Sequence, residues 1–524
     1  MYNQRIWNKV DQYKSNHTNG LRLKLLKSSK NTHFVYVLCT EYNIVLFKDA
    51  DYTKPYKYLP INFEYKFQVL RTPPLLINPS LSDKKGENVV SLGEILAIRF
   101  IREDVEKWSE FRGSVSDLDQ LRQFLGLKMN QIGFHQYFKV YKKIGKGSFA
   151  SVYLAQRIED GTKMAVKAFC KNAVYKEENG KEGLINEIQI MRILDHPNLM
   201  KLYEVYETKN SIYMCLELLE GDQLYGLFKT KRSFTAQQIH SIMKGLLEGL
   251  NYMHNKGIMH RDLKLENILF KEPDNCDSVV IADFGLATKV DQKPFLYTKC
   301  GTPGFVAPEV INLKDDQLSY GSICDVYSLG VILYILSTGQ PVFKGKSYNT
   351  IVRRNREAIV DFQTEKLRQV SDNQRSLLIK MLQADPELRI TSKQALKHEY
   401  FCAYYEEEFA QMYTDDDPHL GEMLVKLNAE YIRLDMEKLK RTNDEDDICK
   451  TEDLKVDQSQ EKNDFLKIIM RTPVITGRTK SIESILYLYL DSPLNGFQSP
   501  NLDPNTHHIQ QIQTKWMNPF VLQN

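Results

Sequence analysis

Long apolar runs, paired cysteines and a strong excess of one charge are all missing from this 524-residue chain. No apolar stretch approaches the roughly 18–20 residues that a membrane-spanning helix needs. The best candidate, Val326–Leu336, contains Ser328 and Gly330, and it is typical of a buried helix. The eight cysteines are scattered, and no pair has the spacing of a zinc site. We therefore expect a cytoplasmic protein with free thiols and no transmembrane segment.

The charge balance argues against a nucleic-acid partner. Seventy basic and 67 acidic side chains leave a formal charge of +3, which is too small for this length to attract nucleic acid by bulk charge. Hydrophobic residues make up 42% and charged residues 26%, an ordinary balance for globular domains. At about 100–200 residues a domain, the length predicts two to four folding units.

Short β-type runs occupy the first quarter of the chain, after an N-terminal extension at 1–19. The clearest of these runs are Phe34–Cys39, Asn43–Phe47 and Ile95–Phe100. Ser116–Leu125 then has an N-capping serine and apolar residues at helical spacing. Strands followed by one helix predict a small α+β domain over 20–128, a β-sandwich or barrel with a C-terminal helix.

This order of elements resembles a pleckstrin-homology-like domain. The resemblance implies a phosphoinositide site made by basic residues of the first two strands. Arg22, Lys24, Lys27 and Lys30 precede a second strand that has no lysine or arginine. Phosphoinositide binding and a structural or protein-binding role both stay open, and the weak basic patch favours the second.

A glycine-rich stretch follows at Ile144–Val152, Ile-Gly-Lys-Gly-Ser-Phe-Ala-Ser-Val. Glycines let the backbone approach phosphate oxygens and offer N–H donors to them, although two glycines between β-type residues are also typical of an ordinary hairpin. Met164–Lys167 is then a predicted strand that ends in a lysine, and an ammonium on an apolar strand needs anions. Glu187, on an amphipathic helical segment, is the carboxylate that we expect beside Lys167; a solvated helix residue is the alternative.

Three strings downstream are more specific. His260–Asn267 is His-Arg-Asp-Leu-Lys-Leu-Glu-Asn, Asp283–Gly285 is Asp-Phe-Gly, and Ala307–Glu309 is Ala-Pro-Glu. In this order they resemble the eukaryotic protein kinases, over about half of the chain at 137–401. The resemblance implies a bilobal fold with a β-rich N-lobe and a helical C-lobe. Ala150 departs from it, because the family has a third glycine there.

The resemblance also implies roles that fit phosphoryl transfer, which requires positioning and charge neutralisation more than covalent chemistry. Asp262 would orient the acceptor hydroxyl and accept its proton, and Lys264 would neutralise charge on the transferring group. Asn267 and Asp283 would supply oxygen ligands to Mg²⁺. A pseudokinase scaffold of the same fold is the competing reading, and the presence of these residues disfavours it.

ATP is the second implied ligand. Lys167 would hold the α- and β-phosphates and would itself be held by Glu187. The main chain of Glu217 and Leu219 would meet the adenine edge. The remaining residues implied around the nucleotide are Ile144, Gly145, Lys146, Gly147, Val152, Ala165 and Leu269, and plain core packing is the alternative for the apolar ones.

Lys264 after Asp262 and the run Gly301–Phe305 resemble serine/threonine kinases, and Gly301–Glu309 with His196–Asn198 resembles the calcium/calmodulin-dependent-like group most closely. Protein substrates with serine or threonine hydroxyls are therefore implied. Arg261 would pair with an activation-loop phosphate, for which Thr298 is the candidate site.

The tail at 402–524 differs in composition. Acidic clusters and polar stretches predict irregular, disordered segments around one amphipathic helix, whose apolar positions are Leu424, Leu427, Tyr431 and Leu434. Phe465–Arg471 is basic and apolar, which fits binding to calmodulin or to the kinase itself; an unremarkable docking segment is the alternative.

Overall fold

The computed structural model describes residues 6–10, 20–28, 33–73, 92–102, 107–147, 149–231, 233–314 and 320–401. The predictions for the tail at 402–524, its amphipathic helix and its calmodulin-type segment among them, lie outside these residues. Within the described ranges, no helix combines the length and apolar character that crossing a membrane requires.

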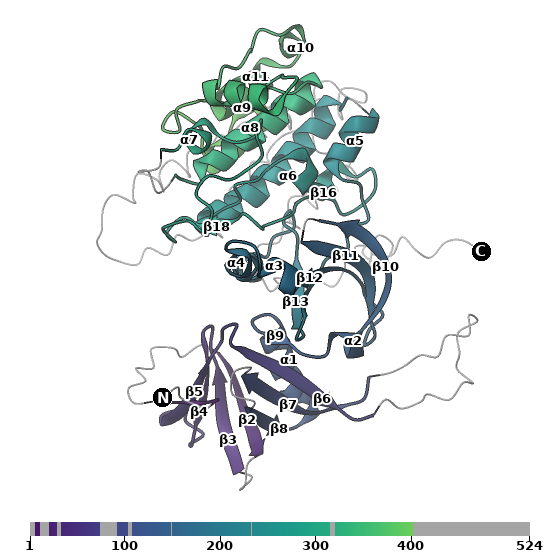
Figure 1. Cartoon of the computed structure of the whole chain (residues 1–524), viewed down its shortest axis with the longest axis vertical. Helices are drawn as coiled ribbons and strands as arrows, with labels where there is room; N and C mark the ends of the chain where they lie inside the picture. The colour runs from purple at the N-terminus through teal and green to yellow at the C-terminus, as the bar shows by residue number, and fades with distance from the viewer. Residues whose placement is uncertain are drawn as a thin grey trace, which may run out of the picture. The chain divides into compact units, whose positions relative to one another are not determined.

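The N-terminal domain consists of antiparallel strands and one helix (Figure 1). Its strands pair in the order β1-β5-β4-β3-β2-β8-β7-β6. Their bounds are Asn8–Lys9 (β1), Leu21–Ser28 (β2), His33–Cys39 (β3), Asn43–Phe47 (β4), Pro55–Pro60 (β5), Tyr65–Arg71 (β6), Ile95–Arg102 (β7) and Lys107–Arg112 (β8). The three strands predicted from sequence therefore form.

The predicted helix also forms, as α1 (Val115–Gly126). The Ser114 side chain accepts a hydrogen bond from the Asp117 backbone N–H at 3.0 Å and so caps the first turn. The segment expected to be an N-terminal extension contributes to this domain as well, because Trp7 is buried and β1 pairs with β5.

A two-residue strand, β9 (Asn130–Gln131), connects this domain to the N-lobe that follows it. It pairs in parallel with β6 on one side and with β13 on the other, so the strands of the domain and of the N-lobe form one continuous sheet. The N-lobe elements are α2 (Phe134–Tyr137), β10 (Phe138–Lys146), β11 (Ala150–Arg157), β12 (Lys163–Cys170), α3 (Lys171–Val174), α4 (Gly180–Ile193), β13 (Leu202–Glu207) and β14 (Ser211–Leu216).

The N-terminal domain and the N-lobe also share one hydrophobic core. Phe67 and Leu121 of the N-terminal domain belong to the same buried cluster as Met164, Val166 and Cys215 of the N-lobe sheet. Burying this apolar surface is favourable at about 25 cal/mol per Å². One face of the N-lobe sheet is therefore covered by the preceding domain, which the sequence analysis did not anticipate.

A buried carboxylate lies at this junction. Glu207, at the end of β13, is 6% exposed. Its Oε1 accepts from Lys66 Nζ at 2.8 Å and from Lys171 Nζ at 2.5 Å, and its Oε2 accepts from Asn130 Nδ2 at 2.7 Å. Lys66 belongs to the N-terminal domain and Lys171 to the N-lobe, so one carboxylate compensates a buried cation from each side.

The C-lobe is helical, and the helix predicted around Val326–Leu336 forms as α8, which is buried on nearly all sides. Helix α6 begins with a capping box between Thr235 and Gln238. The helices are α5 (Leu224–Lys231), α6 (Ala236–Asn255), α7 (Pro308–Ile311), α8 (Ile323–Thr338), α9 (Tyr348–Glu357), α10 (Glu365–Arg368), α11 (Asp372–Met381) and α12 (Ser392–Leu396). The short elements are β15 (Ile258–Met259), η2 (Leu265–Asn267), β16 (Ile268–Phe270), η3 (Cys276–Ser278), β17 (Val279–Ile281) and β18 (Thr288–Lys289).

An ion pair fixes α7 within this lobe. Arg389 Nη1 and Nη2 donate to the two carboxylate oxygens of Glu309 at 2.6 and 2.9 Å. The Arg389 side chain is fully buried, and the parallel pair of bonds is the geometry that a guanidinium and a carboxylate favour.

Replacing Glu207 with Gln tests the junction between the domains. Glutamine keeps the shape but removes the negative charge that the Lys66 and Lys171 ammonium groups share, so we expect the free energy of unfolding to fall by about 3–5 kcal/mol. Denaturant titration measures the change. Glu357→Gln is the matched control, since Glu357 forms an exposed pair with Arg353 at 3.9 Å and its loss should cost at most about 1 kcal/mol.

The same variant has a defined pH dependence. Burial by itself would raise the pKa of Glu207, but hydrogen bonds from Lys171 and Lys66 hold it below its ordinary value. A carboxyl with a lowered folded-state pKa stabilises the protein above its unfolded pKa of about 4.3 and loses this effect as the pH falls through the folded value. The stability difference between wild type and Glu207→Gln should therefore shrink in acid, and a constant difference would contradict the assignment.

Candidate active site

The glycine-rich stretch forms the turn between β10 and β11. Gly145 lies opposite Val152 across the hairpin, and the backbone N–H of Gly147 donates to the Ala150 carbonyl at 2.8 Å. A Cβ added at Gly145 would lie only 3.4 Å from the Val152 Cβ, so the glycine allows a close approach of the two strands. Ile144, at the end of β10, is 45% exposed, which leaves an apolar side chain at the edge of the hairpin.

Lys167 is brought to the interior of the N-lobe by β12, where it lies opposite Val152 and Met214 of the flanking strands. Its Nζ donates to Glu187 Oε1 at 2.7 Å and to Asp283 Oδ1 at 3.4 Å. The buried Glu187 comes from α4, and Asp283 follows β17 of the C-lobe. The predicted pairing of Lys167 with Glu187 is thus present, and a third charged group joins it.

The pKa shifts follow from this arrangement. Burial by itself would lower the pKa of the Lys167 ammonium, but the Glu187 and Asp283 carboxylates outweigh burial and raise it. Burial would likewise raise the pKa of Asp283, but the charge of Lys167 and its hydrogen bond reverse this, so the pKa lies below its ordinary value. Lys167 is therefore protonated and Asp283 ionised at neutral pH.

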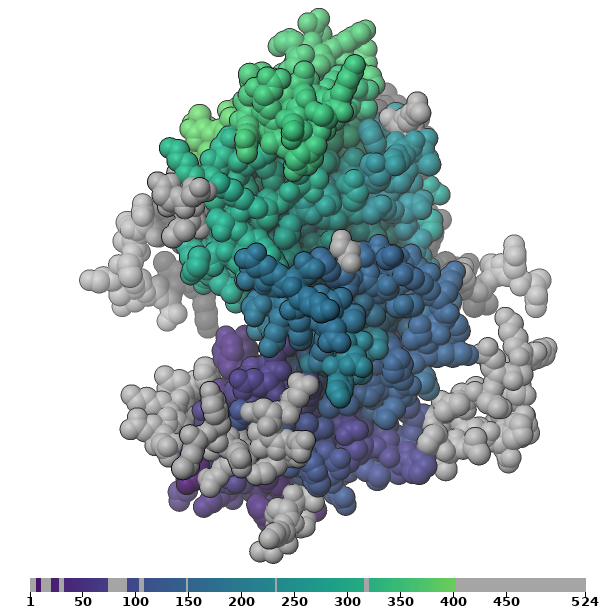
Figure 2. All heavy atoms as spheres, in the orientation of Figure 1, coloured from purple at the N-terminus to yellow at the C-terminus, as the bar shows by residue number. Residues whose placement is uncertain are grey.

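The loop after β15 places three further predicted residues around one carboxylate. Asp262 Oδ2 accepts from Lys264 Nζ at 2.7 Å and from Asn267 Nδ2 at 3.2 Å. Asp262 Oδ1 accepts from the Thr302 hydroxyl at 2.6 Å, and Lys264 Nζ also reaches that hydroxyl at 3.0 Å. Thr302 belongs to the segment before α7, so the loop after β15 and this segment are joined at Asp262. Figure 2 shows the N-lobe in blue and the C-lobe in teal to green.

Buried Asp325, the third residue of α8, holds the loop from beneath. Its two carboxylate oxygens accept from the backbone N–H groups of His260 and Arg261, each at 2.8 Å, and one also contacts His254 Nε2 at 3.2 Å. Arg261 and Asp283 both have positive φ, 70° and 62°. Such backbone persists only where surrounding contacts impose it, and Asp325 imposes it on the loop at Arg261.

His260 is fully buried. Its Nδ1 accepts from the Asp262 backbone N–H at 3.2 Å, and its Nε2 lies 3.1 Å from the Ala282 carbonyl. Both ring nitrogens are therefore occupied by the main chain, which agrees with the interpretation of this histidine as a packing residue rather than a base.

The residues expected around adenine lie on strands of the N-lobe sheet and on the connection that follows β14. Ala165 on β12 lies opposite Leu216, the last residue of β14, and Glu217 and Leu219 follow directly. The Glu217 backbone N–H donates to the Lys201 carbonyl at 3.0 Å, which fixes the start of this connection. Leu269 on β16 contributes from the C-lobe.

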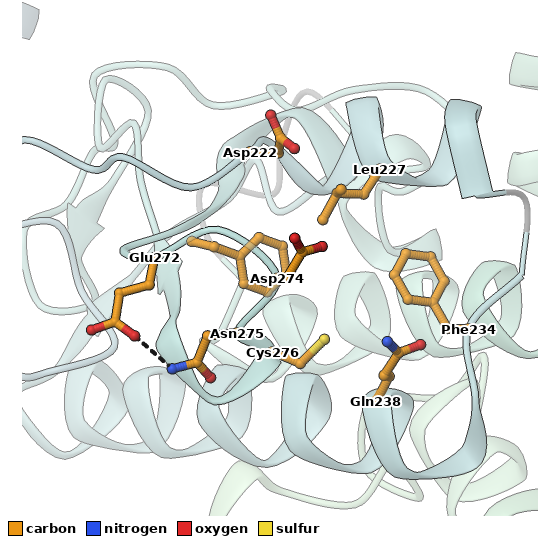
Figure 3. Close-up of a pocket in the computed structure, with 9 residues that line it drawn as sticks. Asp222, Leu227, Phe234, Gln238, Glu272, Asp274, Asn275 and Cys276 are labelled. Atoms are coloured by element: carbon orange, nitrogen blue, oxygen red, sulfur yellow. Dashed lines mark hydrogen bonds between the residues drawn. The ribbon is translucent and has the colours of Figure 1, made fainter.

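A separate pocket lies between α5, α6 and the segment around η3 (Figure 3). Asp222, Glu272 and Asp274 line it together with apolar side chains such as Phe234, and the Asn275 side-chain amide donates to Glu272 at 2.9 Å. None of its nine lining residues belongs to the Lys167 or Asp262 clusters.

The sequence analysis therefore identified the residues that the structure brings together at Lys167 and around Asp262. It did not single out Asp325 and missed the bonds of this carboxylate to the loop. The signal was present, because an aspartate opening an otherwise apolar helix needs buried partners.

Comparison with known proteins agrees with this geometry. The model of the protein kinase domain matches residues 138–401. The chain is 30% identical over 363 residues to "Probable serine/threonine-protein kinase 2" of Plasmodium falciparum, covering 69% of this chain and 66% of the relative. It is 34% identical over 289 residues to "Probable serine/threonine-protein kinase fhkC" of Dictyostelium discoideum, 55% of this chain and 48% of the relative.

"Calcium/calmodulin-dependent protein kinase type 1" of Caenorhabditis briggsae is 37% identical over 256 residues, 49% of this chain and 70% of the relative. The chain spans less than two thirds of the length of the first two relatives. The kinase match nevertheless covers half of the chain and includes each of the charged residues described above. The chain belongs to the protein kinase family.

Proposed function

We propose that this protein transfers the γ-phosphate of Mg-ATP to serine and threonine hydroxyls of protein substrates. The observation that carries the proposal is the meeting of Lys167, Glu187 and Asp283 in one charge cluster. Asp262 is the second centre, and Lys264, Asn267 and Thr302 hold its carboxylate. Phosphoryl transfer is catalysed mainly by positioning and by neutralising charge, and this site offers both.

Asp262 is the residue that accepts the proton of the substrate hydroxyl. The substrate oxygen attacks the γ-phosphorus, the bond from that phosphorus to the bridging oxygen breaks, and ADP departs. The hydroxyl proton passes to the Asp262 carboxylate, whose orientation Thr302 and Asn267 fix. Lys264 lies 2.7 Å from that carboxylate and neutralises charge on the transferring group.

The nucleotide would be held between the hairpin and the C-lobe strand. Lys167 would contact the α- and β-phosphates, and the Gly145–Gly147 backbone would cover them. Glu217 and Leu219 would offer their main chain to the adenine edge. The apolar contacts come from Ile144, Val152, Ala165 and Leu269, with Lys146 at the rim.

Asn267 and Asp283 fit a magnesium ion. Asp283 is an ionised carboxylate, and the Asn267 amide nitrogen donates to Asp262, which leaves the amide oxygen as its ligand atom. Hard oxygen donors of this kind suit Mg²⁺. The bound ion neutralises phosphate charge.

Two finer assignments belong to the proposal. Similarity to calcium/calmodulin-dependent kinases supports membership of that group. The sheet order β5-β4-β3-β2-β8-β7-β6 followed by α1 supports a pleckstrin-homology-like N-terminal domain.

Asp262→Asn tests the assigned base. The amide cannot accept the acceptor proton, so kcat for a serine peptide should fall by about 10²–10⁴-fold while ATP affinity is unchanged. Radiolabelled phosphate transfer and equilibrium ATP titration measure the two quantities. Asp372→Asn is the control, since its side chain is 96% exposed on α11 and its replacement should leave both quantities unchanged. Substantial turnover by Asp262→Asn would remove this residue from the role.

The acceptor class is tested with three peptides that differ only in having serine, threonine or tyrosine at one position. We expect transfer to serine and threonine and none to tyrosine, because Lys264 and Thr302 both bond to the Asp262 carboxylate, as the resemblance to serine/threonine kinases implies, and two relatives are named as such kinases. Running the assay with and without calcium-calmodulin tests the group assignment. A faster reaction with calmodulin supports it, no change counts against it, and tyrosine transfer would contradict the acceptor assignment.

A further inference from the structure

Helix α4 carries Glu187 but is also in contact with the activation segment of the C-lobe, by which we mean the stretch from Asp283 to Glu309. Asn186, next to Glu187, donates from its side-chain amide to the Ala287 carbonyl at 2.7 Å. Near the other end of the helix, the Tyr297 hydroxyl donates to the carbonyl of Asn179, the N-cap residue, at 3.2 Å. The position of α4, and with it that of Glu187, is therefore linked to the segment at two points.

The contact with Tyr297 depends on a glycine. Gly183 is buried within α4, one helical turn before Glu187 and on the same face. A Cβ at this position would lie 2.6 Å from the Tyr297 hydroxyl oxygen and 3.5 Å from two ring carbons. A glycine inside a helix is unfavourable relative to alanine, so helix formation does not explain it. The space that the tyrosine hydroxyl needs explains the glycine.

Arg261 holds the main chain of the same tyrosine. Its Nη1 donates to the Tyr297 carbonyl at 2.5 Å and to the Tyr320 hydroxyl at 3.2 Å, and its Nε donates to the Leu286 carbonyl at 2.7 Å. The guanidinium adjoining Asp262 is thus bonded to three oxygens of the chain itself. The sequence analysis expects the same guanidinium to pair with a phosphate on Thr298, and this stays a prediction.

We propose that Tyr297 is a positioning residue for phosphoryl transfer and that Gly183 leaves the space on α4 in which its hydroxyl lies. Arg261 fixes the main chain of Tyr297, the Tyr297 side chain fixes α4, and α4 keeps Glu187 on Lys167. The inference rests on the proposed kinase activity and deepens it, because it names the contact through which this segment sets the site.

The test uses the full-length protein, treated with phosphatase and checked by mass spectrometry, and a serine peptide. Gly183→Ala should lower kcat by about fivefold, since the added methyl pushes the tyrosine hydroxyl away from the Asn179 carbonyl and so removes this contact. Tyr297→Phe should lower kcat by a similar factor, the worth of one ordinary hydrogen bond. Both changes remove the same contact, so the double variant should lose no more than Tyr297→Phe alone.

Gly226→Ala is the matched control. Gly226 also lies in a helix, α5, but an added Cβ there has nothing within 4 Å, so kcat should stay at the wild-type value. A wild-type rate for Gly183→Ala would overturn the proposal, as would a double variant whose loss is the product of the two single losses.

Hydrogen exchange of α4 separates this inference from the proposed function. Amides of Gly180–Ile193 should exchange faster in Gly183→Ala and in Tyr297→Phe, and no faster in the double variant than in either single variant. This readout needs no turnover. A wild-type protein without transfer to any peptide would refute the kinase proposal, whereas unchanged exchange in Gly183→Ala would refute the Tyr297 contact alone.

Discussion

The ammonium group of Lys167 lies between two carboxylates that come from different parts of the fold, and the catalytic site depends on that meeting. An isolated charge in this interior would be costly, and so would Glu187 without its partner. Because Lys167 is on β12, Glu187 on α4 and Asp283 beyond β17, their ion pairs join the N-lobe sheet, its helix and the C-lobe. The charges that serve the chemistry also fix the relative positions of the elements that carry them.

Helix α4 is the element on which several of these constraints act. The activation segment contacts it through Tyr297 and Ala287. At its C-terminal end, Arg192 donates to Asn130 Oδ1 at 2.8 Å, and its guanidinium lies 5.4 Å from the Phe63 ring centroid. The N-terminal domain therefore contacts the same helix that carries Glu187. Through the shared core and Glu207, this domain is built into the N-lobe rather than joined by a linker alone.

Local patterns in the sequence were sufficient for the elements and for the charged residues of the site. Alternation predicted β3, β4 and β7, a serine cap and apolar spacing predicted α1, and short motifs located Lys167 and Asp262. The charged residues of the proposed active site could be predicted because phosphoryl transfer requires particular side chains at short spacings.

The remaining features depend on contacts between distant segments. Met164 and Val166 are apolar residues of the kind found in any buried strand. Nothing in them indicated that another domain covers them. Gly183 and Tyr297 show no periodicity that relates a glycine on one helix to a tyrosine on a distant loop. Asp325 was visible as a polar residue in an apolar helix, but its partners became known only from the fold.

Magnesium-dependent ATP binding tests the central claim most directly, that Lys167, Asp283 and Asn267 belong to one nucleotide site. ATP affinity would be measured by calorimetry with and without Mg²⁺, for the wild type and for Asp283→Asn. The account predicts that Mg²⁺ tightens ATP binding to the wild type and that this gain disappears in the variant, which still binds ATP through Lys167. An equal gain from Mg²⁺ in both proteins would contradict it.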